Sequence, residues 1–353
     1  VLGIITDLSR AINNNNLIEI KALLAQLGKT PFFKKIKPTP YDEAVSLTWY
    51  LENIFYNSIS NIQKYIKSNI TDKNFVNHDL ISLGFWPGGD RDGNPFVTNA
   101  ITIKTAYKLR SDILKNYYRD VRKLRRRLTF KKIEEIIIDI ENRLYISMTR
   151  DRVKPSISLD ELKEKLRYVK NQIVKKHESL YVDEVQDLID KIDIFGYHFA
   201  SLDIRQDSSI HDKVFYKVLT LIFDVNTANK YKLMNDDEKI SFISKVNFAN
   251  KKTLYFDKDL TNTLGSIEAM KLIQKSNGQA GSHRYIISHN QSPLNVLEVF
   301  NMFLFTGWIK PSVDIAPLFE TIDDLKISES VMDKVYKNKL YQNHLKRRNN
   351  KQI

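Results

Sequence analysis

Apolar positions recur at three- and four-residue spacing along most of the chain, which is the period of amphipathic α-helices. The clearest case is 17–27, after which Gly28 stands where a C-cap is expected. Ser158 followed by Glu161 indicates a capping box before a helix that begins at Leu159. Further helices are predicted at 42–66, 98–128, 130–148, 212–221 and 236–245. The pattern therefore predicts a mainly α protein.

Four short apolar stretches interrupt the helical pattern. Each is bounded by chain-breaking residues, as buried strands are, and they lie at 80–86, 197–204, 285–288 and 313–319. Polar residues follow each stretch, and in the later ones a capped helix comes next. This order is typical of a β/α barrel, which has eight strands and functional side chains at their carboxyl ends. We therefore expect long helices packed around part of a TIM-like barrel, with about four of the eight strands present and a helical insertion at about 98–195.

Glycine is concentrated in one segment. Four of the 11 glycines lie between positions 84 and 93, and the string from Trp86 to Pro95 reads WPGGDRDGNP. Glycine permits positive φ and close approach of the backbone to a ligand. Arg91 lies between Asp90 and Asp92, which can hold its guanidinium toward an anion. A tight turn with a local salt bridge explains the same residues equally well.

The net charge of +13 is confined to two patches, because residues 101–133 carry +10 and residues 334–353 carry +7. Such patches are more typical of a solvated surface or a subunit contact than of a nucleic-acid interface, so we expect no nucleic-acid partner. The chain has no cysteine, which excludes disulfides and thiolate chemistry and fits a cytoplasmic location. No apolar run is long enough to cross a membrane, and we expect no membrane contact.

Three motifs resemble those of phosphoenolpyruvate carboxylases. They are the glycine-rich string Gly88–Pro95 with Trp86 before it, the stretch 202–208 (LDIRQDS) and the stretch 317–325 (PLFETIDDL). Weaker similarities lie at 38–43, 286–288 and 292–297. The motifs follow the family's order and span nearly the whole chain. The sequence thus resembles the central part of a bacterial-type phosphoenolpyruvate carboxylase.

The resemblance implies a carboxy-lyase that converts phosphoenolpyruvate and bicarbonate to oxaloacetate and phosphate, which feeds the tricarboxylic acid cycle. The family reaction passes through carboxyphosphate and an enolate and uses Mg²⁺ or Mn²⁺. Both species are anions, so the site needs a metal ion and arginines in a water-poor cavity. The resemblance also implies a homotetramer for the full-length protein.

Roles for individual residues follow from the same resemblance. Glu320 matches the metal-ligand glutamate, and because Asp323 and Asp324 already supply acid to the next helix, a ligand is favoured over a dipole-stabilised acid. Arg205 matches the arginine that contacts bicarbonate or phosphate, with an ion pair to a neighbouring aspartate as the alternative. The remaining site residues match a loop that lines the cavity. Trp86 and Arg91 are predicted to be catalytic, and Asp90, Arg91, Asp92 and Asn94 are predicted to bind substrate.

The three histidines near these motifs are expected to be structural. His289 stands where the family has another residue, and His198 and His211 match no motif position. A lone histidine of this kind is more often a satisfied or surface side chain than a base.

The family's catalytic histidine lies in a Thr-x-His-Pro-Thr stretch that this sequence lacks. Its second metal-ligand aspartate and its mobile glycine-rich loop come after the matched part. We therefore expect a central fragment that makes no oxaloacetate without the remainder of the same enzyme. The alternative hypothesis is a non-catalytic helical module that binds nucleic acid or anionic partners through basic residues such as Arg125, Arg126 and Arg127.

Overall fold

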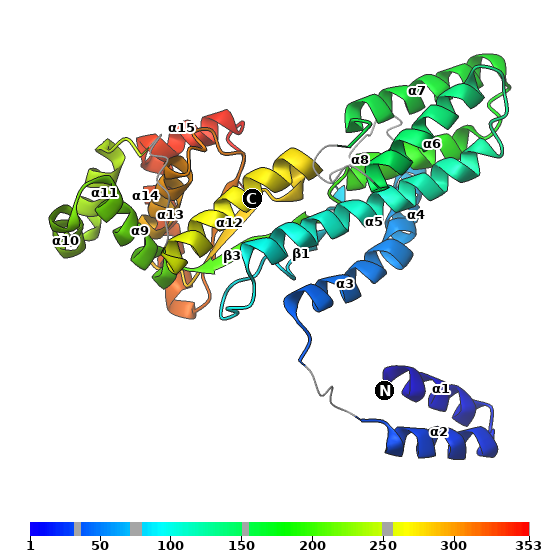
Figure 1. Ribbon diagram of the computed structural model, residues 1–353, viewed down its shortest axis with the longest axis horizontal. Coiled ribbons are helices and arrows are strands. Elements are labelled where there is room, and N and C mark those ends of the chain that lie inside the picture. The colour runs from blue at the N-terminus through cyan, green and yellow to red at the C-terminus, as the bar shows by residue number, and fades with distance from the viewer. Residues whose placement is uncertain (32–36, 71–79, 150–154, 249–256, 353) are drawn as a thin grey trace. The chain divides into compact units, whose positions relative to one another are not determined.

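The computed structural model describes residues 1–31, 37–70, 80–149, 155–248 and 257–352. The chain divides into two compact units, Val1–Thr39 and Pro40–Ile353 (Figure 1). The first unit contains a hairpin of two helices, α1 (Leu2–Asn13) and α2 (Leu17–Lys29). Helix α2 continues through Gly28 and ends at Lys29, and the C-cap residue is Thr30, which is extended. The prediction of a glycine C-cap at Gly28 is therefore wrong.

The second unit is largely helical. It begins with α3 (Pro40–Tyr50) and α4 (Tyr56–Asn69), which a π-helical turn, Leu51–Phe55, joins without a break, so the long helix predicted at 42–66 is confirmed. The helix predicted at 212–221 begins earlier, at Ser208. The remaining helices are α5 (Asn99–Arg125), α6 (Ile133–Thr149), α7 (Leu159–Lys176), α8 (Val182–Phe195), α9 (Ser208–Ile222), α10 (Val225–Leu233), α11 (Asp236–Lys245), α12 (Lys258–Asn277), α13 (Pro293–Phe305), α14 (Ile322–Lys337) and α15 (Lys339–Arg347).

Five short strands pair in parallel and form two small sheets within the described part of the chain. One sheet contains β1 (Gly84–Phe85) and β2 (Ser201–Leu202). The other has the order β3 (Ile204–Asp207), β4 (Arg284–Ser288) and β5 (Asp314–Pro317). The mainly helical architecture with short parallel strands is confirmed, whereas a partial barrel stays a prediction.

Three of the predicted strands are shorter or later than expected, and the one predicted at 313–319 covers only Asp314–Pro317. Of the stretch 80–86, only Gly84 and Phe85 pair in a sheet. Residues 71–79, which precede the stretch, lie outside the described residues. In the stretch 197–204 the backbone of Phe199 has a φ of 64°, in the left-handed region, which an extended strand cannot contain. Pairing therefore starts at Ser201 and continues, after Asp203, to Asp207.

Two apolar cores support these elements. One lies among α5, α6, α7 and α8 and includes the fully buried residues Tyr117, Ile137 and Leu166. The other surrounds the three-stranded sheet and includes Tyr285 and Phe303. Complete burial of each such side chain contributes roughly 1.5–3 kcal/mol relative to exposure. The second core fixes the strand ends that carry the polar motifs.

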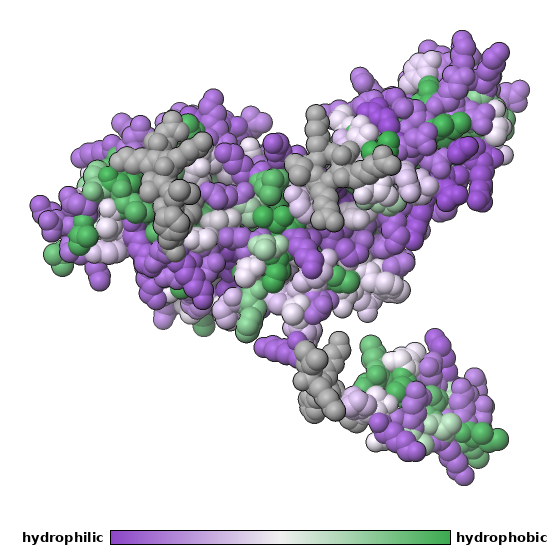
Figure 2. Space-filling model, in the orientation of Figure 1, coloured by the Kyte–Doolittle hydropathy of each residue, from purple (hydrophilic) through white to green (hydrophobic). Residues whose placement is uncertain are grey.

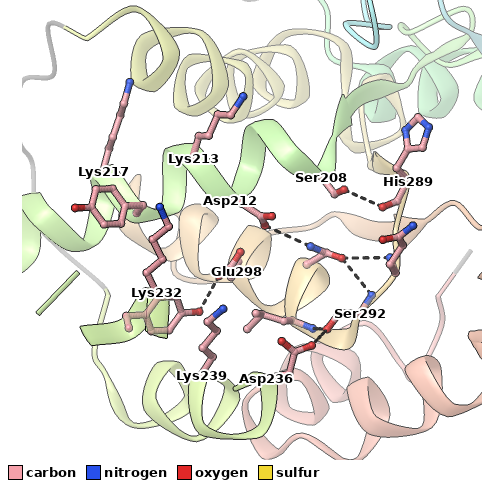
Figure 3. A pocket seen from close by; sticks show the side chains of 15 residues that line it. Ser208, Asp212, Lys213, Lys217, Lys232, Asp236, Lys239, His289, Ser292 and Glu298 are labelled. Carbon is pink, nitrogen blue, oxygen red and sulfur yellow. Dashed lines mark hydrogen bonds between the residues drawn. The ribbon is translucent and has the colours of Figure 1, made fainter. Parts of the chain in front are cut away.

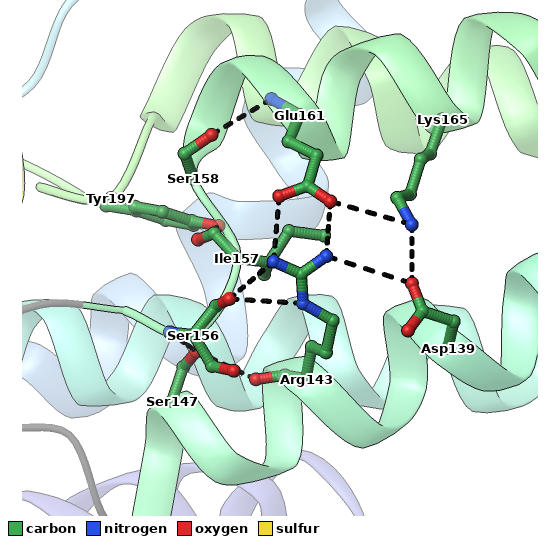
Figure 4. Close-up of polar contacts among 9 residues, drawn as sticks. All are labelled: Asp139, Arg143, Ser147, Ser156, Ile157, Ser158, Glu161, Lys165 and Tyr197. Carbon is green, nitrogen blue, oxygen red and sulfur yellow. Dashed lines mark hydrogen bonds and ion pairs between the residues drawn. The ribbon is translucent and has the colours of Figure 1, made fainter.

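An ion-pair network joins α6 to α7 (Figure 4). Arg143 of α6 donates to Glu161 Oε2 at 2.7 Å and to the carbonyl oxygen of Ser156. The Ser158 hydroxyl accepts from the Glu161 amide at 3.2 Å, as predicted for an N-cap. The Glu161 carboxylate binds Arg143 instead of the Ser158 amide, so only half of the predicted capping box is formed.

The α5–α8 region presents a mainly hydrophilic surface in Figure 2. Basic residues at the end of α5 and just beyond it form ion pairs there, including Arg125 with Glu141 at 2.9 Å and Arg127 with Glu184. Among the helices within the described ranges, none is both long and apolar enough to span a bilayer.

Candidate active site at the strand ends

The carboxyl ends of β3, β4 and β5 lie side by side, because Asp207 pairs with Ser288 and Ile287 with Pro317. Arg205 is in β3, His289 directly follows β4, and Glu320 follows β5. Nη2 of Arg205 lies 2.7 Å from Glu320 Oε1. Parallel pairing thus brings together two predicted site residues that are 115 positions apart in the chain.

The glycine-rich loop adds a second carboxylate to this group. Asp92 Oδ2 lies 2.8 Å from Nη2 of Arg205. The loop runs beside β3, since the Arg91 amide donates to the Arg205 carbonyl at 3.0 Å and the Arg205 amide donates to the Gly89 carbonyl at 3.1 Å. One guanidinium nitrogen therefore joins the loop to the end of β5.

His289 and Asp207 complete the group, which we call the strand-end cluster: Asp92, Arg205, Asp207, His289 and Glu320. Nδ1 of His289 lies 3.0 Å from Asp207 Oδ2, and its Nε2 lies 3.3 Å from Glu320 Oε2. Burial acts to raise the pKa of Asp207, but hydrogen bonds from Ser209 and the contact with His289 outweigh it and hold that pKa below its usual value. Asp207 is therefore an anion at neutral pH.

Arg91 lies outside the strand-end cluster. Its side chain is buried, and burial lowers its pKa to about 10. In the described parts of the chain neither Asp90 nor Asp92 contacts its guanidinium, so the expected pairing with these carboxylates is not found. Its guanidinium instead donates to three oxygen atoms on α5 and α12: Asn99 Oδ1, Thr102 Oγ1 at 3.2 Å and Asn262 O at 2.7 Å. Sequence adjacency to two carboxylates did not determine where the side chain points.

Trp86, Asp90 and Asn94 line a pocket of about 210 Å³ next to the cluster, and Asp92 lines it as well. The Trp86 side chain is 57% exposed, so its ring is accessible to a ligand. Asn94 Oδ1 accepts from the Phe96 amide at 3.1 Å and closes the turn that follows the loop. Four of the five predicted loop residues thus share one pocket, and Arg91 is the exception.

The donor set of the cluster suits a divalent cation. Ligand atoms of Asp92, Asp207 and His289 lie within 4.8 Å of one another, and Glu320 contacts the same imidazole. The cluster contains three carboxylates, of Asp92, Asp207 and Glu320, and one guanidinium, of Arg205. Its net charge is therefore −2 when His289 is neutral. Carboxylate oxygens are preferred by Mg²⁺ and Mn²⁺, and imidazole suits the transition metals.

Two members of the cluster were not predicted from the sequence. Asp207 was considered only as an ion-pair partner of Arg205, and His289 was expected to be structural. The available signal was position, since both residues stand at the end of a predicted strand, as Arg205 and Glu320 do. Desolvation lowers the pKa of the partly buried His198 to about 4 and that of the buried His211 to about 3.

A larger pocket of about 660 Å³ borders the cluster, because Ser208 and His289 are among its lining residues. Figure 3 shows Asp212 and Glu298 in its interior, with lysine side chains from α9, α10 and α11 around them. Burial, reinforced by Asp212, raises the pKa of Glu298 well above its usual value. The Tyr231 hydroxyl donates to Glu298 Oε1 at 2.7 Å. No residue of this interior was predicted as functional.

Comparisons with known proteins agree with these motifs. The family profile described as phosphoenolpyruvate carboxylase matches residues 6–158 and 142–353. A phosphoenolpyruvate carboxylase of Prochlorococcus marinus (strain AS9601) is 26% identical over 96% of this chain and 41% of its own length. One of Parasynechococcus marenigrum (strain WH8102) is 23% identical over 90% of this chain and 38% of its own length. The chain spans about 40% of these relatives, and it belongs to the phosphoenolpyruvate carboxylase family.

Proposed function

We propose that the protein containing this chain forms oxaloacetate and phosphate from phosphoenolpyruvate and bicarbonate, and that the strand-end cluster is one wall of its active site. The observation that carries the proposal is the position of Arg205 between Asp92 and Glu320, at 2.8 and 2.7 Å. The three residues come from the three motifs that resemble the family. Asp92 and Glu320 both contact the same nitrogen atom of Arg205, which supports a common site for the three motifs.

Arg205 is suited to bind the bicarbonate or phosphate group. Its Nη2 serves both carboxylates, while its Nε is buried and has no hydrogen-bond partner among the residues that the structure describes. A guanidinium with donors to spare binds an oxyanion through short, charge-assisted hydrogen bonds. Asp92 and Glu320 keep this guanidinium in place before the anion arrives.

Glu320 is the proposed ligand of Mg²⁺ or Mn²⁺ in this site. A divalent cation held there would supply the positive charge that stabilises an enolate oxygen. Glu320 is positioned for this by its contacts with Arg205 and His289 and by the capped start of α14 behind it. Further ligands come from the cluster and from the remainder of the enzyme.

The loop residues have two different proposed roles. Trp86, Asp90 and Asn94 line the neighbouring pocket, where they bind substrate and exclude water. Arg91 acts at a distance, because its hydrogen bonds to α5 and α12 fix the loop that carries Asp92. It is therefore a positioning residue.

The basic-module alternative is less well supported. Arg125 and Arg127, on which it depends, already form ion pairs with Glu141 and Glu184. Phosphate binding by these arginines would require both pairs to break.

The test is a malate-dehydrogenase-coupled assay of two proteins, the 353-residue chain by itself and the product of the whole reading frame that contains it. We expect the second protein to oxidise NADH only when phosphoenolpyruvate, bicarbonate and Mg²⁺ or Mn²⁺ are all present. We expect the first to be inactive, because it lacks the family's catalytic-histidine motif. An inactive reading-frame product would refute the proposed function, and an active 353-residue chain would refute its dependence on the remainder of the enzyme.

A further inference from the structure

We propose that His289 is a metal ligand in the strand-end cluster and that its imidazole makes the site prefer Mn²⁺ to Mg²⁺. The inference rests on the proposed function only in taking Glu320 as a metal ligand. It adds a residue and a choice of ion that the family resemblance does not provide, since His289 occupies a position where the family has another residue.

The first observation is the position of the imidazole. Both ring nitrogens face carboxylate oxygens, Nδ1 toward Asp207 at 3.0 Å and Nε2 toward Glu320 at 3.3 Å. Asp207 ends β3 and Glu320 follows β5, so the ring lies between the two strands that flank β4. On the Asp207 side, ligand atoms of Asp92, Asp207 and His289 lie within 4.8 Å of one another, so the imidazole is among potential ligands of one ion.

The second observation is the backbone at His289, which has a φ of 51°. This left-handed conformation is uncommon for residues other than glycine, although Asn, Asp and His adopt it more often than most. The carbonyl of His289 also accepts from the Ser208 hydroxyl at 2.8 Å, which ties the turn to the start of α9. The ring is therefore presented by a fixed turn, even though the side chain is 55% exposed.

The third observation is the number and kind of donors. Asp92, Asp207 and Glu320 offer carboxylate oxygens, and His289 offers one imidazole nitrogen. Arg205 compensates only one of the three negative charges. The exposed fractions of these side chains, 21% for Asp92, 24% for Asp207 and 25% for Glu320, leave the site open to an ion from solvent.

This donor set distinguishes between the two candidate ions. Mg²⁺ takes oxygen ligands in a strict octahedron and keeps several waters, so an imidazole adds little to its affinity. Imidazole suits first-row transition ions, among which Mn²⁺ also accepts carboxylates readily. Removal of the imidazole should therefore weaken Mn²⁺ binding and leave Mg²⁺ binding nearly unchanged.

The experiment measures Mn²⁺ binding to the full chain from the electron paramagnetic resonance signal of free Mn²⁺, and Mg²⁺ binding by competition. The variants are His289→Asn and His289→Asp, both of which tolerate a left-handed backbone. His177→Asn is the matched control, because His177 stacks on Phe130 away from the cluster. Glu320→Gln tests the metal site itself, and circular dichroism verifies that each variant is folded.

We expect His289→Asn to weaken Mn²⁺ binding about tenfold, with the Mg²⁺ affinity changed by no more than about twofold. His289→Asp should recover binding but lose the preference for Mn²⁺, since it supplies an oxygen donor. The inference is overturned if His289→Asn affects both ions equally or neither. Loss of binding in Glu320→Gln with no effect of His289→Asn would leave the proposed metal site standing and remove only His289 from it.

Discussion

A β-carbon added at Gly89 would lie 2.0 Å from the carbonyl oxygen of Asp203. The glycine-rich loop therefore packs directly against the chain that leads into β3. This contact explains why a glycine is needed there, and it is the close backbone approach that brings Asp92 within 2.8 Å of Arg205. The loop and the strand act as one unit in positioning the site.

Gly89→Ala should destabilise the chain by about 1–3 kcal/mol, the usual cost of forcing an extra group into a packed region. The obstructing atom belongs to the backbone and cannot rotate away. Gly3→Ala is the control, because no atom lies within 4 Å of a β-carbon at that position. The free energy of unfolding in urea gives the comparison, and equal stability of both variants would contradict the packing argument.

The parts of the site that were predictable are those with a local signal. Arg205 and Glu320 each follow a short apolar stretch that is bounded by chain breakers. Glu320 does follow a strand, β5, whereas Arg205 lies inside β3. The glycine cluster indicated a close approach of the backbone to a ligand, which stays a prediction, and the structure shows Gly89 in close approach to the backbone of Asp203. In these cases neighbouring residues alone restrict the structure.

The parts that could not be predicted depend on partners far along the chain. Arg91 bonds to Asn262, which is 171 positions away, and nothing beside Arg91 in the sequence indicates this contact. His289 lies between two weak similarities, at 286–288 and 292–297, but matches neither, and its role depends on the pairing of β4 with strands on both sides. Strand lengths were misjudged for a similar reason, since pairing and not hydrophobicity decides where a strand begins.

Arg205→Lys should reduce kcat/KM of the reading-frame product by about 10²–10³, the range found when one oxyanion-stabilising donor is lost. A lysine retains the charge but cannot contact both carboxylates and an anion with a planar fork of donors. Arg127→Lys makes the same exchange just beyond α5, where the pairing partner is Glu184, and should leave the kinetics unchanged. Equal rates for the two variants in the coupled assay would remove Arg205 from the site.

Arg91→Lys separates the positioning role of Arg91 from direct substrate binding. Lysine cannot reproduce the two-nitrogen fork that contacts these three oxygen atoms, and the buried hydrogen bond to Thr102 Oγ1 would be lost, at a cost of about 1–3 kcal/mol. We expect a lower free energy of unfolding and a lower kcat, with little change in KM for phosphoenolpyruvate. Arg10→Lys is the control, because Arg10 is 75% exposed. A raised KM at unchanged stability would instead place Arg91 in contact with substrate.

Glu298→Gln should stabilise the chain at alkaline pH. Burial, with the nearby Asp212, raises the pKa of Glu298 well above its usual value, so the folded chain retains a proton that the unfolded chain releases. The stability that this carboxyl provides is therefore complete below its unfolded pKa, near 4.3, and is lost as pH rises toward its folded pKa. The loss is at most about 1.4 kcal/mol per pH unit.

Glutamine removes this titration and keeps an acceptor for the Tyr231 hydroxyl. The difference in unfolding free energy, variant minus wild type, should therefore increase from pH 5 to pH 8. Glu329→Gln on α14 is the control for the substitution itself. If the difference in unfolding free energy for Glu298→Gln did not change with pH, Glu298 would be ionised in the folded chain. Glu298 and Asp212 would then both be carboxylates in the interior of the larger pocket.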